Sequence, residues 1–153
     1  MRNRPLVQLA KTAVAATFLL AAVLGFVPGI TTGYDDLSFA GHESQAELVG
    51  LFQTSVLHNV VHGLFGVIGL ALARTAAGAR RFLLGGGVVY LLLAAYGTVI
   101  DHDSAANFVP VNVADNVLHL ALGTTMVVLG LVLRKHAPHA GNLADARARA
   151  GAR

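Results

Sequence analysis

Two histidines one helical turn apart, His58 and His62, stand inside a long apolar stretch of the chain. Residues at i and i+4 share one face of a helix, so both imidazoles can offer a nitrogen to one metal ion. Fifty-seven residues later, Asp115 and His119 repeat this spacing. The four side chains therefore predict a three-histidine, one-carboxylate site for a divalent transition metal. A zinc-protease motif is excluded, because it needs Glu after the first histidine and this chain has Asn59.

The pair His62 and His119 also admits other functions. One histidine on each of two facing helices is what bis-histidine ligation of a b-type haem requires. The same pair could relay protons or cations gathered at the outer mouth by a polar cluster of Asp101, His102 and Asp103. Packing is the competing explanation, since Asn and His side chains also hydrogen-bond between membrane helices and Asp commonly caps turns. The sequence leaves these alternatives open.

The histidines belong to a pattern that occurs twice. The motif Asn-x-x-His-x-x-x-Gly begins at Asn59 and again at Asn116. Steps of three and four residues keep such positions on one helical face, and small residues there let two backbones approach. We therefore predict a stripe that packs the second membrane span against the fourth. The stripe consists of Ser55, Asn59, Gly66, Gly69, Asn112, Asn116, Gly123 and Gly130, with Ala73 at its inner end.

Composition indicates which elements carry these residues. Of the 153 residues, 55% are hydrophobic and 12% are charged, whereas a soluble domain has about 25% charged residues. Four apolar runs are each near the ~20 residues that cross a bilayer as a helix. They cover residues 12–27, 48–73, 82–100 and 111–133. We predict an all-α protein with a membrane domain over residues 12–136, a tail over 1–11 and a disordered tail over 137–153.

Charge predicts the topology. All eleven Lys and Arg residues lie in the N-terminal tail, between the second and third spans, or in the C-terminal segment. Seven of the eight acidic residues lie in or beside the other two loops. The positive-inside rule therefore predicts a plasma-membrane protein with both termini cytoplasmic. The first run lacks a small-x-small cleavage site after it, so we expect an uncleaved span.

A looser match between the first and third spans adds to the repeat. Residues of the first span match residues of the third span seventy-two positions later. This offset is larger than the fifty-seven residues between the second and fourth spans because the loop after the first span is longer than the loop after the third. We predict two helical hairpins in tandem, related by a pseudo-twofold axis along the membrane normal. Such an axis would bring His62 near His119.

The absence of cysteine and the placement of the basic residues exclude some kinds of site and partner. It has no cysteine, so disulfides, thiolate metal sites and cysteine nucleophiles are excluded. The sequence pI is 9.8, but the basic residues flank apolar runs as anchors, so nucleic acid is not an expected partner. The expected partners are the lipid bilayer and another copy of the chain. We favour a non-enzymatic membrane component, with haem or metal binding or proton and cation conduction as the alternative.

Several blocks of sequence together resemble a known family. The blocks are Leu24–Thr32, Gly50–His62, Asp101–Asn112 and Asp115–His119. Their combination is similar to the small bacterial four-helix membrane family called domain of unknown function DUF4383, over about Ala13 to Leu133. The resemblance implies a four-span inner-membrane protein. It implies no catalytic residues.

Overall fold

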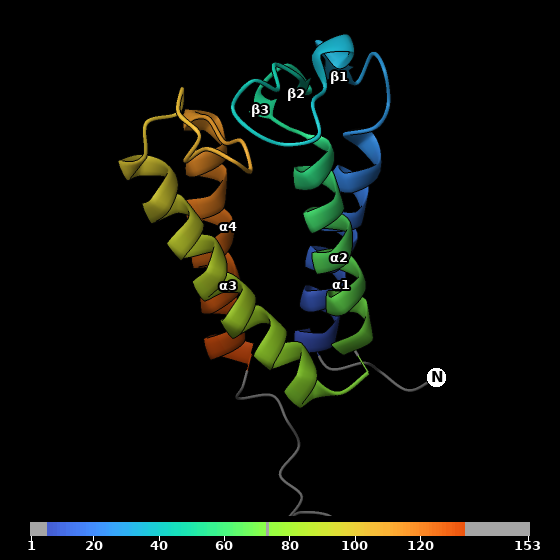
Figure 1. Cartoon of the computed structure of the whole chain (residues 1–153). Helices are drawn as coiled ribbons and strands as arrows, with labels where there is room; N and C mark the ends of the chain where they lie inside the picture. Colours follow the sequence, from blue (N-terminus) through green and yellow to red (C-terminus); the bar gives the residue numbers. More distant parts are fainter. Residues whose placement is uncertain (1–5, 73, 134–153) are drawn as a thin grey trace, which may run out of the picture.

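The computed structural model describes residues 6–72 and 74–133, and in these ranges the chain forms four α-helices and one small sheet (Figure 1). This confirms the all-helical class. Three of these helices are long and apolar enough to cross a membrane, and α2 is a shorter apolar helix of 17 residues. The predicted tail 137–153, Ala73 and the first five residues lie outside the described ranges. The helices are α1 (Leu6–Leu24), α2 (Val56–Leu72), α3 (Ala76–Val99) and α4 (Val113–Val132).

The helices pack as two pairs. α1 lies along α2 and α3 lies along α4, and the pairs meet mainly through α1 and α3 (Figure 1). Aromatic side chains fill the middle of this contact. The Phe18 ring lies 5.2 Å from Tyr90, and the Phe65 ring lies 5.3 Å from Phe82, between ring centroids. Rings in such tilted arrangements attract each other as well as bury area, so the cluster holds the two pairs together.

A small antiparallel sheet caps one end of α1 and α2 (Figure 1). Its strands are β1 (Thr31–Thr32), β2 (Glu47–Leu48) and β3 (Phe52–Gln53), in that order. Thr31 pairs with Leu48, which also pairs with Phe52. A single turn of 3-10 helix, Tyr34–Asp36, lies between β1 and β2. The sequence did not predict this sheet.

The sheet explains why α2 begins at Val56 and not near Leu48, where the apolar run begins. Val49 and Gly50 adopt left-handed backbone conformations, with φ of 51° and 67°, and turn β2 into β3. The Ser55 hydroxyl then accepts a hydrogen bond from the His58 N–H at 3.1 Å, as a helix N-cap does. An apolar run alone does not separate a short hairpin from the helix that follows it.

The other helix ends also differ from the predicted spans. α1 begins at Leu6, so Lys11 is a buried residue within the helix and not part of a tail. α3 begins after Thr75, whose hydroxyl accepts from the Gly78 N–H at 3.0 Å. Arg80 therefore belongs to α3, where its Nε donates to the Gly130 carbonyl at 3.1 Å. Basic side chains commonly donate to the last carbonyls of a helix in this way.

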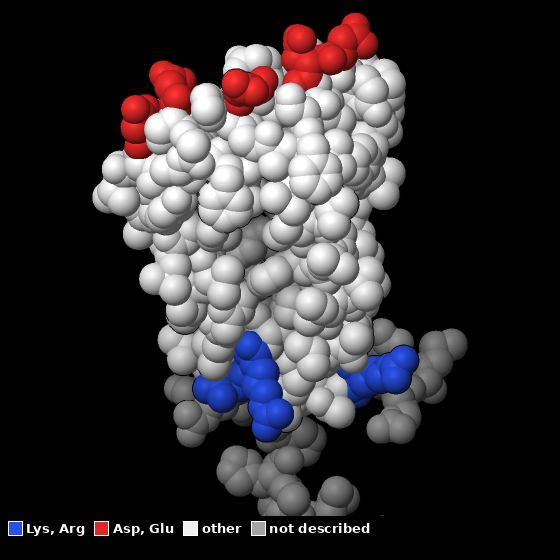
Figure 2. All heavy atoms as spheres, viewed as in Figure 1, with Lys and Arg blue, Asp and Glu red and all other residues white. Residues whose placement is uncertain are grey.

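The surface of the molecule has three zones. Asp and Glu side chains gather at the end that carries the sheet, and Lys and Arg at the opposite end, with a band free of these charges between them (Figure 2). Large apolar side chains face outward in this band, among them Val23, Leu92 and Val117, each more than 60% exposed. An apolar surface this extensive suits hydrocarbon and not water.

The stripe of small residues packs within the pair α1 and α2 and within the pair α3 and α4, which corrects the prediction that it joins the second span to the fourth. A Cβ on Gly66 of α2 would lie 2.6 Å from Leu19 and 3.0 Å from the Ala15 carbonyl of α1. On α4, a Cβ on Gly130 would lie 2.7 Å from Leu84 of α3. Periodicity shows which helical face packs, but not which helix it meets.

Asn59 and Asn116 also pack within the two helix pairs and not between α2 and α4. The amide of Asn59 lies against Gly25, which directly follows α1, and the amide of Asn116 lies against Gly97 of α3. In both pairs a Cβ on the glycine would collide with the amide. In each helix pair, therefore, one asparagine packs directly against one glycine.

The consecutive glycines Gly85, Gly86 and Gly87 lie in α3. The first and the last of them have opposite environments, and this yields a stability test. A Cβ on Gly87 would lie 2.8 Å from the Gly123 carbonyl oxygen and 3.0 Å from the Val127 nitrogen. Backbone atoms cannot move aside as a side chain can. We expect Gly87→Ala to lower the free energy of unfolding by about 1–3 kcal/mol, measured by thermal or denaturant unfolding in detergent.

Gly85 supplies the matched control, because a Cβ there would meet nothing within 4 Å. Gly85→Ala should leave stability unchanged or raise it by up to about 1 kcal/mol, since alanine favours the helix. Equal losses in the two variants would show that α3 and α4 do not approach at Gly87.

Candidate metal centre

Three histidines from two helices come together in the interior. His58 and His62 of α2 and His119 of α4 each offer one nitrogen, and these nitrogens all lie within 4.8 Å of one another. His58 and His119 are each 4% exposed, and His62 is half-buried. A tetrahedral ion bound at ~2.0–2.1 Å holds its ligands about 3.3 Å apart. Small rotations of the imidazoles would therefore close the group around one ion.

Two of these imidazoles have a ring nitrogen that no hydrogen bond within the described parts of the chain occupies. The Nδ1 of His58 lies 3.0 Å from the Pro110 carbonyl oxygen. A carbonyl only accepts, so Nδ1 carries the hydrogen and the lone pair of Nε2 remains for a metal. The Nδ1 of His119 is buried with no hydrogen-bond partner among the described residues. Coordination would satisfy a nitrogen that is otherwise costly to bury.

Aromatic rings pack against the imidazoles of His62 and His119. Tyr90 meets His119 edge-on, with ring centroids 5.0 Å apart and planes at 89°. Phe18 lies 5.8 Å from His62. Neither ring was among the predicted site residues. Phe18 and Tyr90 are separated by the same seventy-two residues that relate the first span to the third, and this offset was the available signal that both rings border the histidines.

Asp115, the fourth predicted ligand, has a different role. Its Oδ2 accepts hydrogen bonds from the N–H of Gln53 at 3.0 Å and of Asn112 at 2.9 Å. The Asn112 side chain in turn accepts from the Asp115 N–H at 3.0 Å, which completes a capping box at the start of α4. Asp115 therefore joins α4 to β3, and the group of possible metal ligands contains three histidines without it.

The predicted outer-mouth residues build a turn. Asp101 and Asp103 are exposed, and Oδ1 of Asp101 accepts from the Asp103 N–H at 3.0 Å. His102 folds back over the end of α3, with its Nε2 2.6 Å from the Gly97 carbonyl oxygen. These contacts fit the capping explanation, and none of them leads to the three histidines.

Two small cavities share the histidines as a common wall. One, of about 120 Å³, extends toward α1 and includes Phe18 and Asn59 in its lining. The other, of about 130 Å³, extends toward Tyr96 and Phe108. Sites for drug-sized ligands usually measure about 300–1,000 Å³. The space between His62 and His119 therefore suits an ion or a molecule of few atoms, and it is too small for haem.

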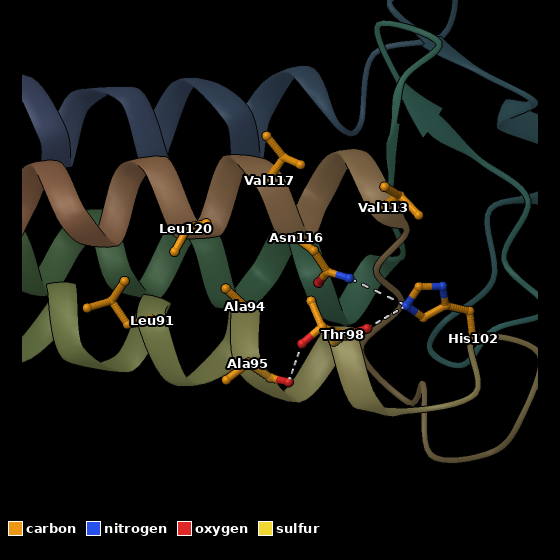
Figure 3. A pocket seen from close by; sticks show the side chains of 10 residues that line it. Leu91, Ala94, Ala95, Thr98, His102, Val113, Asn116, Val117 and Leu120 are labelled. Carbon is orange, nitrogen blue, oxygen red and sulfur yellow. Dashed lines mark hydrogen bonds between the residues drawn. The ribbon is translucent and has the colours of Figure 1, made fainter.

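A larger groove of about 480 Å³ lies between α3 and α4 (Figure 3). None of His58, His62 and His119 lines it. Its walls are mostly apolar, and its polar end contains His102 and Asn116 (Figure 3). The Asn116 Nδ2 lies 3.5 Å from the His102 Nε2. The sequence assigned these two residues to the outer mouth and the stripe, and it did not predict that they meet.

Comparison with known proteins identifies the family. A family model described as a domain of unknown function (DUF4383) matches residues 8–132, a range that contains all three histidines. This confirms the resemblance seen in the sequence. No curated protein and no solved structure matches the chain.

Proposed function

The chain belongs to the family of the domain of unknown function DUF4383, and from this premise we propose that it is a multi-pass membrane protein that binds one divalent transition-metal ion at His58, His62 and His119. The observation that carries the metal site is the convergence of three imidazole nitrogens within 4.8 Å. Imidazole suits zinc, copper, iron and nickel. Three protein ligands leave one position of a tetrahedral ion open.

The architecture that holds this site is two hairpins in tandem. Matching contacts in the two halves support it. Phe18 packs beside His62, and Tyr90 packs beside His119. Phe18 and Tyr90 are seventy-two residues apart, and the two histidines are fifty-seven apart. The same two offsets relate the contact of Gly25 with Asn59 to that of Gly97 with Asn116.

Contacts exchanged between the halves support a pseudo-twofold axis. His58 bonds to the backbone of Pro110, and Asp115 bonds to the backbone of Gln53. Positions 53 and 110 are fifty-seven residues apart, as are positions 58 and 115. A twofold relation requires this reciprocity, in which residue i of one half meets residue j of the other and the reverse.

The protein lies in the plasma membrane with four spans and both termini in the cytoplasm. The separation of acidic and basic ends supports this orientation (Figure 2). α2 has 17 residues, about 26 Å of helix, which is at the short end of the range for a span. The sheet that precedes α2 then lies at the outer surface, with the turn between Asp101 and Asp103.

Single cysteines test the orientation, because the natural chain has none. Asp103 and Ala77 are both exposed and lie in opposite end zones. In intact cells, Asp103→Cys should react with a membrane-impermeant maleimide, and Ala77→Cys should react only after permeabilisation. The reverse pattern, or equal labelling of both thiols, would contradict cytoplasmic termini.

Metal titration of the purified full chain tests the site. After removal of metal by a chelator, the protein should bind one Zn²⁺ or Co²⁺ per chain, and Co²⁺ should give the visible absorption of a tetrahedral complex with nitrogen ligands. A chain that is folded by circular dichroism and binds neither ion would contradict the proposed function.

A further inference from the structure

We propose that the open position of the bound metal takes a small hydrogen-bond-accepting anion, such as hydroxide or azide, and that Asn59 donates a hydrogen bond to it. This inference rests on the proposed metal site and names the class of ligand that the site accepts. Three features support it: the cavity beside the histidines, the Asn59 Nδ2 that has no acceptor among the described residues, and the charge that three neutral ligands leave on a divalent ion.

The cavity limits the ligand to a few atoms. The space of about 120 Å³ is bordered by His58, His62, His119 and Asn59. One water occupies about 30 Å³ of liquid, so this volume corresponds to roughly four water molecules. Most of the remaining wall is apolar, including Phe18. A triatomic anion fits such a space, and a lipid or a cofactor does not.

Asn59 supplies a fixed donor at this cavity. The residue is 1% exposed, and its Oδ1 accepts from the Thr54 hydroxyl at 2.7 Å. Its Nδ2 is buried without a hydrogen-bond partner among the described residues. Because the amide lies against Gly25, it has little room to turn. A buried amide N–H without an acceptor is costly, and a ligand atom in the cavity would supply the acceptor.

The second cavity has no amide donor in its lining. It borders the same three histidines, and the rest of its lining is largely apolar or aromatic, including Leu93 and Phe108. Tyr90 borders both cavities, so its hydroxyl does not distinguish them. The Tyr96 hydroxyl at this cavity already donates to the Ala106 carbonyl at 2.9 Å. The ligand is therefore expected on the side of Asn59.

Charge favours a monoanion. Three neutral imidazoles leave both positive charges on a divalent ion, and a site of low dielectric strengthens its attraction for an anion. Asp115 also borders the cavity, although its Oδ2 already accepts two backbone N–H groups. This carboxylate disfavours ligands with more than one negative charge.

Azide titration of the Co²⁺-loaded full chain in detergent tests the inference. The visible bands of Co²⁺ should change with saturation as azide replaces water at the open position. Asn59→Leu keeps the branched shape of the side chain and removes the donor. Hydrogen bonds to charged groups are strong, so this variant should bind azide at least about 10-fold more weakly, with Co²⁺ affinity unchanged.

Asn116→Leu is the matched control. Asn116 occupies the same position of the repeated motif and lies against Gly97, but it borders the groove between α3 and α4 and not the histidine cavity. The azide affinity of the Asn116→Leu chain should equal that of the parent chain. Thr54→Val is a second test, for use if Asn59→Leu does not fold. It removes the hydroxyl that orients Asn59 and should weaken azide binding several-fold.

The outcomes separate the two proposals. Failure of the folded chain to bind Co²⁺ would overturn both. Binding of Co²⁺ without any spectral response to azide would overturn the anion site and leave the metal site standing. An azide response that Asn59→Leu and Asn116→Leu weaken equally, or that neither weakens, would overturn the role of Asn59.

Discussion

A chain carrying His119→Gln is expected to bind Zn²⁺ at least about 100-fold more weakly than the parent chain. Losing an outer-shell partner of a ligand typically lowers affinity 10–100-fold, and removing a ligand itself has a larger effect. His119 is the member that α4 contributes, and without it His58 and His62 remain as one i, i+4 pair. Competition with a chromophoric chelator measures the change.

The other histidines refine this prediction. His62→Asn should lower Zn²⁺ affinity to a similar extent. His58→Gln should lower both affinity and stability, because it also loses the contact with the Pro110 carbonyl. His102→Gln is the control, since His102 is half-buried but lies over the end of α3. If His102→Gln weakened Zn²⁺ as much as His119→Gln, the ion would not be at the three-histidine group.

Replacing Asp115 by alanine is expected to lower the free energy of unfolding by about 3 kcal/mol or more. Its Oδ2 accepts from the N–H groups of Gln53 and Asn112. Both donors are half-buried, so each one left without an acceptor costs about 1 kcal/mol or more, and loss of a helix cap adds about 1 kcal/mol. Asp115→Ala should also loosen the sheet from α4, because the bond to Gln53 joins β3 to this helix. Denaturant unfolding in detergent measures the loss.

Asp115→Asn provides the control for this effect. It keeps a side-chain oxygen in the same place and removes the carboxylate charge. We expect a loss within about 1 kcal/mol, since both backbone donors can keep an acceptor. If Asp115→Asn were as unstable as Asp115→Ala, the carboxylate charge and not the acceptor would be what matters at this position.

Much of the helical architecture followed from local pattern. Apolar runs of sufficient length predicted the helices, and caps such as Ser55 and Thr75 explain where two of them begin. The runs misplaced the start of α2, because the apolar stretch Leu48–Phe52, which turns β2 into β3, continues directly toward the helix. Hydrophobicity reports burial in any element, so a two-residue strand beside a helix leaves no separate signal.

The candidate site was predicted only in part, for a similar reason. The spacing of His58 and His62 on one turn is a local property, whereas the proximity of His119 to both of them appears only in the tertiary structure. Asp115 shares the same spacing, but its carboxylate is occupied by Gln53 and Asn112. Which acceptor meets which donor depends on where β3 lies relative to α4, and no periodicity encodes that distance.

The sequence by itself determined the membrane-type composition, the helices, the repeated motif and two adjacent imidazoles, because these depend on neighbours within a few turns of the chain. The tertiary structure decided that the glycines of the stripe meet α1 and α3, and that His119 lies beside the two histidines of α2. It also decided that Asn59 borders the cavity beside that group. Each of these contacts joins residues on different helices, and a face of small residues can pack against any partner of matching shape.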